Sequence, residues 1–285
     1  MAIFRCNFRR TCAVTLPPEY PDRARPAKRS HRVGTQLLPG CDRQPGMLFD
    51  RLLPRILPIL WPARCAGCSG FVAEGTSFCC DCEVSVLQLG HCCPGCAMPN
   101  EGGAWCGGCR RAPFPFARAA AALAYGGALT QALLHFKHGG HRYLARPLAP
   151  YLSPLLAAAA EEGASFVCPV PLHPHRLRQR GYNQVLELLR AAGKALPRQQ
   201  EIEVIADALS RTIDTPILGR QSPTRRRQMV ANAFTCARPR AVAGKCVLVV
   251  DDVMTTGATL SECARTLLAS GASRVMVAAL ARAID

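Results

Sequence analysis

Two adjacent carboxylates at the end of an apolar run are the first feature of this 285-residue chain that suggests chemistry. The run occupies residues 247–250, and Asp251 and Asp252 follow it directly. Neighbouring carboxylates repel each other unless they serve hydroxyl groups or a divalent cation. A ribose with bound Mg²⁺ offers both, so we predict that this pair faces a sugar.

Hydroxyl groups and a flexible glycine follow the acidic pair, in the order Thr255, Thr256, Gly257, Ala258 and Thr259. A helix is expected to begin here, and a helix N-terminus attracts phosphate through its unpaired amides and its dipole. We therefore predict that these five residues bind a phosphate group. An acidic turn before a capped helix would explain Asp252 and Thr259 separately, but not the whole string.

Alternating arginines, Arg176, Arg178 and Arg180, follow an apolar segment at residues 166–172. We expect this region to form a basic turn. Guanidinium groups suit the oxygens of a diphosphate because they offer several N–H donors in one plane. A solvated basic loop without a ligand is the alternative reading.

Cysteine is the most unusual component, since ten of the 17 cysteines lie between Cys65 and Cys109. Eight of them form four C-x2-C pairs, namely Cys65/Cys68, Cys79/Cys82, Cys93/Cys96 and Cys106/Cys109. Two intervening residues let one tight turn present both sulfurs to a tetrahedral ion. A secreted disulfide module is the alternative, but the rest of the chain resembles a cytosolic enzyme, so we expect zinc and a cytoplasmic location.

Two pairs make one metal site, and four thiolates leave no open position on the ion. We therefore predict two structural Zn²⁺ ions, with no catalytic role for either. Pairing in sequence order would combine the first two pairs and the last two, and an interleaved arrangement stays open. Cys80 and Cys92 lie beside these pairs and could replace a neighbour as ligand.

Strand-like and helix-like segments alternate from residue 116 onward, which predicts an α/β fold with a parallel sheet flanked by helices. We expect strands ending near 125 and at 166–172, 246–250 and 274–280, and helices at 128–138, 143–160, 182–196 and 259–270. The run at 247–250 is apolar throughout, as in a strand covered on both faces. Ligands bind at the carboxyl ends of such strands, where the acidic pair stands.

Composition changes along the chain predict three parts. Residues 1–46 are rich in Arg and Pro and are expected to be a disordered or misannotated extension, with Met47 as a second candidate start. Residues 47–112 should form the double zinc-ribbon module, and residues 113–285 the α/β domain. No apolar run is long enough to predict a membrane span.

The net charge of +16 suggests an anionic partner. A polyphosphate metabolite and nucleic acid both fit such a charge, as does a basic surface that meets only solvent.

The string at 247–259 resembles the signature of type I phosphoribosyltransferases. Together with the cysteine module and the segment PVPLHPHRLRQRGYNQ at 169–184, it makes the chain similar to the ComF family, proteins associated with natural competence. The resemblance implies a site for phosphoribosyl pyrophosphate with Mg²⁺. It implies that Asp251 and Asp252 meet the ribose hydroxyls, that residues 255–259 hold the 5-phosphate, and that the arginine segment meets the pyrophosphate.

The resemblance also implies a part in DNA uptake, with single-stranded DNA and other competence proteins as candidate partners. It leaves the activity open, because Met229 stands where the family usually has Asn. One hypothesis is a Mg²⁺-dependent phosphoribosyltransferase of unknown acceptor. The alternatives are a non-catalytic protein that handles single-stranded DNA, or one that senses the ribosyl diphosphate through a vestigial site.

Overall fold

The computed structural model describes residues 62–194, 196, 202–215 and 222–284. These residues all belong to one compact unit, Leu48–Asp285. The extension expected over residues 1–46, and the candidate start at Met47, lie outside the described residues.

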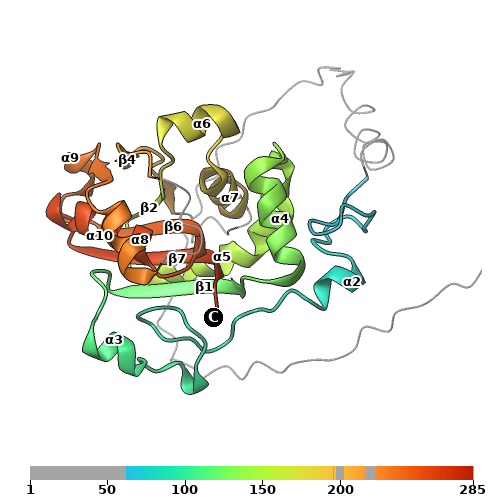
Figure 1. Ribbon diagram of the computed structural model, residues 1–285, viewed down its shortest axis with the longest axis horizontal. Coiled ribbons are helices and arrows are strands. Elements are labelled where there is room, and N and C mark those ends of the chain that lie inside the picture. Colours follow the sequence, from blue (N-terminus) through green and yellow to red (C-terminus); the bar gives the residue numbers. More distant parts are fainter. Residues whose placement is uncertain (1–61, 195, 197–201, 216–221, 285) are drawn as a thin grey trace, which may run out of the picture. The chain divides into compact units, whose positions relative to one another are not determined.

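A five-stranded sheet forms the centre of the unit, and all of its strand pairs are parallel, as predicted. The strand order is β1-β7-β6-β2-β3 (Figure 1). The bounds are β1 Arg118–Ala124, β2 Phe166–Pro169, β3 Glu203–Val204, β6 Cys246–Met254 and β7 Arg274–Arg282. A separate antiparallel pair joins β4 Leu209–Arg211 to β5 Phe234–Cys236.

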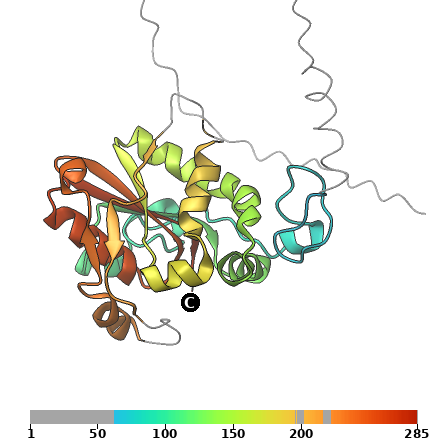
Figure 2. The same cartoon turned by 90° about the horizontal axis from the view of Figure 1, so that it is seen from above.

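Helices cover both faces of the sheet (Figures 1 and 2). On one face lie α4 Gly127–His138, α5 Ala145–Glu161 and α7 Gln184–Gly193, and on the other lies α10 Ala258–Ala269. Side chains of a strand alternate between faces, so Leu248 and Val250 pack toward the first group while Val247 and Val249 pack toward α10. This double cover explains the continuous apolar run in β6.

The predicted helices at 128–138, 182–196 and 259–270 correspond to α4, α7 and α10. The basic turn expected after Leu172 is wrong, because α6 Pro174–Arg180 is a helix. His173 caps its first turn, Pro174 occupies the first turn where its missing N–H costs nothing, and Gly181 ends it in the left-handed conformation at φ 81°. These start and stop signals were legible in the sequence.

The remaining elements are short: α2 Cys80–Glu83, η1 Glu101–Gly103, α3 Gly107–Arg111, η2 Arg142–Leu144, α8 Pro223–Val230 and α9 Pro239–Val242. Among them, α8 and α9 fall with β3, β4 and β5 in the region where the sequence shows no clear period. Elements of two to eight residues complete too few turns or alternations to produce one.

The cysteine-rich segment covers the outer edge of β1. The amide of Leu89 donates to the Ala122 carbonyl at 2.9 Å, and that of Ala124 donates to the Leu87 carbonyl at 2.8 Å. The amide of Ala119 donates to the Pro94 carbonyl at 2.7 Å. An edge strand exposes unpaired backbone groups, so this segment completes the sheet instead of leaving β1 open.

Within the described residues, none of the helices has the length and apolar character required to cross a lipid bilayer.

Candidate functional site

Asp251 and Asp252 lie within β6, which continues past them to Met254. Because neighbouring side chains in a strand point to opposite faces, the two carboxylates meet different neighbours. Asp252 is only 4% exposed and lies on the face of α4 and α7, whereas Asp251 is partly buried on the face of α10.

Two polar side chains from different helices hold Asp252. Its Oδ1 atom pairs with Nζ of Lys137, at the end of α4, at 3.0 Å. Its Oδ2 atom accepts a hydrogen bond from Nε2 of Gln184, at the start of α7, at 2.8 Å. Burial acts to lower the pKa of Lys137, but the charge and the hydrogen bond of Asp252 and the charge of Asp251 together outweigh it, so the pKa lies above its ordinary value. The ammonium group therefore stays charged beside Asp252.

Asp251 is in a different electrostatic state. Burial raises its pKa to about 7, and the neighbouring charge of Asp252 adds to the rise, while Lys137 and Arg211 partly offset it. The amide of Asp252 donates to Oδ1 of Asp251 at 2.9 Å. Near neutral pH the Asp251 carboxyl can therefore gain or lose a proton, so the pair is not a fixed double negative charge.

The residues from Thr255 to Thr259 form the turn between β6 and α10. Gly257 has φ 74°, which a side chain tolerates poorly, and a Cβ there would lie 3.0 Å from Cε of Met254 and 3.1 Å from Cε1 of Phe114. Asp251 and residues 253–260 line an open hollow at this turn. Because the first amides of α10 have no partner within the helix, they are free to bind an anion.

The three predicted arginines have separate surroundings on α6. Nε of Arg176 pairs with Oδ1 of Asp214 at 3.1 Å, and its guanidinium also donates to the Thr215 carbonyl. Arg180 is partly buried and donates to Oε1 of Gln184, the residue that holds Asp252. Burial lowers the pKa of Arg180, and the positive charge of Arg176 also acts to lower it. The negative charge of Asp252 opposes this change without cancelling it. Arg178 is exposed.

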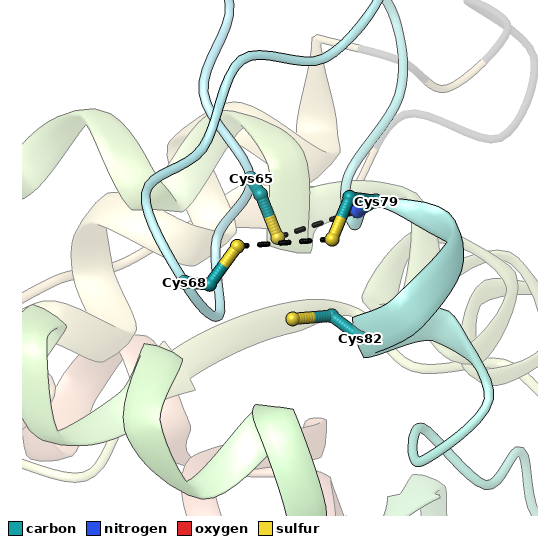
Figure 3. Close-up of side chains that lie close together, drawn as sticks. All are labelled: Cys65, Cys68, Cys79 and Cys82. Atoms are coloured by element: carbon teal, nitrogen blue, oxygen red, sulfur yellow. Dashed lines mark hydrogen bonds between the residues drawn. The ribbon is translucent and has the colours of Figure 1, made fainter.

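The structure brings the eight predicted cysteines together in two groups, paired in sequence order. Group 1 is Cys65, Cys68, Cys79 and Cys82, whose sulfurs point toward a common centre (Figure 3). Group 2 is Cys93, Cys96, Cys106 and Cys109. Cys80 and Cys92 belong to neither group.

Both groups have the dimensions of a tetrahedral zinc site. The sulfurs of each group lie within 4.8 Å of one another, with Cys68 to Cys79 at 3.7 Å and Cys96 to Cys106 at 3.8 Å. Four sulfurs about 2.3 Å from a Zn²⁺ ion are separated by about 3.8 Å. The donor set therefore fits structural zinc.

Backbone amides prepare one thiol of each group for metal. The amide of Cys79 donates to Sγ of Cys65 at 3.3 Å, and the amide of Cys106 donates to Sγ of Cys93 at 3.2 Å. Burial acts to raise the pKa of both thiols, but such N–H donors outweigh it and lower each pKa to about 6. The thiolate form, which is the one that binds metal, is thus favoured.

Lys137, Gln184 and Arg211 were not predicted as site residues. Lys137 and Gln184 contact Asp252 directly, and Arg211 lies close enough to Asp251 for their charges to interact. Lys137 is more than one hundred positions from Asp252 in the sequence, so no local pattern connects them. Gln184 does end the family-like segment at 169–184, which was the available signal.

Two family models match the chain. A phosphoribosyl transferase domain matches residues 204–285, which include the acidic pair and the turn before α10. A double zinc ribbon domain matches residues 56–110, which include both cysteine groups.

Three curated relatives are similar to the chain over different lengths. DNA utilization protein YhgH of Escherichia coli O157:H7 is 32% identical over 197 residues, covering 67% of this chain and 84% of the relative. Competence protein F of Haemophilus influenzae is 36% identical over 118 residues, covering 41% and 50%. Competence protein ComFC of Bacillus subtilis is 22% identical over 205 residues, covering 68% and 78%.

Proposed function

Because the chain belongs to the ComF family, we propose that it binds phosphoribosyl pyrophosphate together with Mg²⁺ at the carboxyl end of β6. In this proposal Asp251 and Asp252 accept hydrogen bonds from the ribose hydroxyls, and Thr255, Thr256, Gly257, Ala258 and Thr259 hold the 5-phosphate. Arg176, Arg178 and Arg180 face the pyrophosphate.

The observation that carries the proposal is that Asp251 and the glycine turn line one open hollow, with Asp252 next to Asp251 in β6. A ribose 5-phosphate needs acceptors for its hydroxyls and donors for its phosphate within one sugar's length. Residues 251–259 supply both, since the carboxylates lie in the last part of β6 and the first amides of α10, which have no partner within the helix, follow the turn. The match of residues 204–285 to a phosphoribosyl transferase domain supports the same ligand class.

In the reaction typical of such a domain, a nucleophile forms a bond to ribose C1 while the bond from C1 to pyrophosphate oxygen breaks. Bound Mg²⁺ would neutralise the charge of the diphosphate. The chain's own residues would orient the sugar and hold its phosphate, and the cationic side chains of α6 would stabilise the departing pyrophosphate. No covalent intermediate with the protein is needed.

The first experiment measures phosphoribosyl pyrophosphate binding calorimetrically in the presence of Mg²⁺. The double variant Asp251→Asn with Asp252→Asn keeps the side-chain shape but removes both charges, so we expect affinity to fall at least about a hundredfold. The control is Asp207→Asn, which removes an exposed carboxylate paired with Arg238 at 2.5 Å. Unchanged binding by the double variant would refute the proposed site.

The raised pKa of Asp251 gives the site a pH signature. Below about pH 7 the carboxyl of the free protein is protonated and can accept fewer hydrogen bonds from ribose. We expect affinity to increase between pH 6 and pH 8, and Asp251→Asn to remove this dependence. The same pH profile in the variant would show that another group titrates.

Catalysis is a separate question, because the acceptor is unknown. A pyrophosphate-release assay of the zinc-loaded protein across bases, nucleosides and single-stranded DNA would test it. Release with one acceptor would support a transferase. Ligand binding without release would support a sensor of the ribosyl diphosphate.

The names of the relatives, DNA utilization and competence proteins, favour DNA handling as a second candidate function. The net charge of +16 is compatible with contact to DNA phosphates, and other competence proteins are natural partners in such a role. Free thiols at metal-binding spacing are typical of a reducing compartment, which supports our proposal of a cytoplasmic location. If DNA is bound through several phosphates, affinity for a single strand must fall steeply as salt increases.

A further inference from the structure

Arg282, at the end of β7, is a buried cation that the proposed site does not use. It is 8% exposed, and its guanidinium donates to backbone carbonyls of three chain segments. Nε donates to the Cys96 carbonyl at 2.8 Å, within group 2. One terminal nitrogen donates to the carbonyls of Met254 at 3.1 Å, Thr255 at 2.5 Å and the adjacent Ala283 at 2.6 Å. The first two stand where residues 255–259, proposed to hold the 5-phosphate and called the phosphate turn below, begin. Figure 1 shows this end of the chain, marked C, beside the cysteine-rich segment.

These bonds orient two amide groups; the Met254 carbonyl also accepts a hydrogen bond from the Ala283 amide at 3.0 Å, so Thr255 is the one of the two that depends more on Arg282. In a trans peptide the carbonyl and the following N–H point in opposite directions, and the described backbone contains no cis bonds. Because the carbonyls of Met254 and Thr255 point to Arg282, the N–H groups of Thr255 and Thr256 point away from it. Both residues line the hollow proposed to hold the 5-phosphate.

Phe114 makes a second connection between group 2 and the same turn. Its ring packs against the cysteines of group 2, and its Cε1 atom lies 3.1 Å from where a Cβ on Gly257 would be. The ring also stacks on Phe116, with centroids 4.9 Å apart and planes 9° apart. Phe116 is 3% exposed and belongs to the core on the α10 face of the sheet, so the ring of Phe114 has little room to move.

We propose that Arg282 is a positioning residue that ties group 2 to the phosphate turn, so that an intact second zinc ribbon is needed for tight binding of a phosphoribosyl ligand. The ligand part of this inference rests on the proposed function. Binding linkage is reciprocal, so the ligand should also slow loss of metal from group 2. The segment that carries group 1 contacts α4 and α5 instead, and within the described part of the chain it has no hydrogen bond to the phosphate turn.

Two substitutions separate the hydrogen bonds of Arg282 from its charge. Arg282→Met removes both. Arg282→Lys keeps the charge but replaces two separate nitrogens, one on the Cys96 carbonyl and one on the turn carbonyls, by a single one, so the connection between the two segments should be lost or weakened. We expect both variants to bind ribose 5-phosphate about tenfold to a hundredfold more weakly than the unmodified chain, with zinc content unchanged. The control is Arg274→Met, at the other end of β7, where the side chain pairs with Glu162 at 3.5 Å. We expect its affinity to stay within twofold of the unmodified chain.

Hydrogen exchange of residues 254–260 tests the connection without any ligand. We expect faster exchange there in both Arg282 variants and in Cys109→Ser, but not in Arg274→Met or in Cys82→Ser, which disrupts group 1. Phe114→Leu, a milder change, should accelerate exchange of the same residues. It therefore tests the connection even if Arg282→Met does not fold. If the unmodified chain does not bind ribose 5-phosphate, the proposed function fails while exchange still decides the connection. Two results would overturn the proposal. One is unchanged hydrogen exchange of residues 254–260 in both Arg282→Lys and Phe114→Leu. The other is an affinity of Arg282→Lys for ribose 5-phosphate equal to that of the unmodified chain.

Discussion

The two cysteine groups repeat one local design but are buried to different degrees. Each has two C-x2-C pairs, a short helix after the third cysteine, and an amide that donates to the first sulfur. Cys68 of group 1 is exposed and only Cys65 is fully buried, whereas three cysteines of group 2 are buried. The local sequence therefore gives both groups the same arrangement of cysteines, and the surrounding fold gives them different solvent exposure.

The two groups are also connected to the proposed site through different elements of the fold. Group 1 lies against the start of α4, whose other end presents Lys137 to Asp252. Group 2 lies against the phosphate turn through Arg282. One ribbon thus lies against the helix that presents Lys137 to Asp252, on the proposed sugar side, and the other is joined to the proposed phosphate side by the guanidinium of Arg282.

Metal removal should have the largest effect and should distinguish the groups in time. Structural zinc in small domains is worth about 10 kcal/mol or more, so chelation of both ions should unfold the cysteine-rich segment. We expect two Zn²⁺ per chain and two phases of release, the faster from the more exposed group 1. A colorimetric chelator measures both phases, and Cys82→Ser should lack the fast one. A single phase from the unmodified chain would contradict this difference.

Lys137→Met tests the contact between α4 and Asp252. It leaves the carboxylate of Asp252 buried without its cation, which should cost about 3–5 kcal/mol of unfolding free energy. Urea denaturation measures this, and adding Asp252→Asn should recover much of the loss. Arg190→Met, which removes an exposed partner of Glu187, is the control and should cost less than about 1 kcal/mol. A cost for Lys137→Met as small as the control would mean that solvent already screens the pair.

Equivalent glycines in the two ribbons provide a matched pair. A Cβ on Gly67 would lie 2.8 Å from Cβ of Ala128 in α4 and 3.0 Å from Sγ of Cys82 in its own ribbon. One on Gly95 would lie 2.8 Å from Cβ and 2.9 Å from Sγ of Cys109, both within its own ribbon. Each alanine substitution should cost about 1–3 kcal/mol through overpacking. Gly95→Ala should accelerate metal release more strongly, because its Cβ would press on two atoms of the Cys109 ligand, while the closest contact of Gly67→Ala is with α4, whose packing it should weaken.

Gly90→Ala is the control for that pair, because a Cβ there would meet nothing within 4 Å. Thermal unfolding and chelator kinetics of the three variants give the comparison. Equal metal release from Gly67→Ala and Gly95→Ala would show that the two ribbons respond alike to crowding.

Ser85→Ala should give the smallest effect. Oγ of Ser85 accepts a hydrogen bond from the Ala128 amide at 3.0 Å, in the first turn of α4, where Gly126 provides no side-chain cap. Loss of such a cap costs about 1 kcal/mol. Urea denaturation should detect this change, with Zn²⁺ content unaltered. A variant as stable as the unmodified chain would mean that water replaces the hydroxyl without loss.

Much of this fold could be read from the sequence because its signals are local. The C-x2-C spacing predicted the metal groups, and the apolar run at 247–250 predicted a doubly covered strand. The helix α6 was missed although His173, Pro174 and Gly181 marked its ends, because its arginines were interpreted as a loop. The elements between residues 203 and 242 were missed because they are too short to show a period.

The sequence by itself determined which groups can do chemistry: paired carboxylates before a glycine turn, and thiols at metal-binding spacing. Only the tertiary structure decided how these groups are held. Strand alternation gave Asp251 and Asp252 different neighbours, and chain folding brought Lys137 to one and Arg282 to the turn beyond. A buried cation is stabilised by the oxygens that surround it in space. The oxygens around Arg282 include the carbonyl of Cys96, 186 positions away in the sequence, and no local pattern can encode that contact.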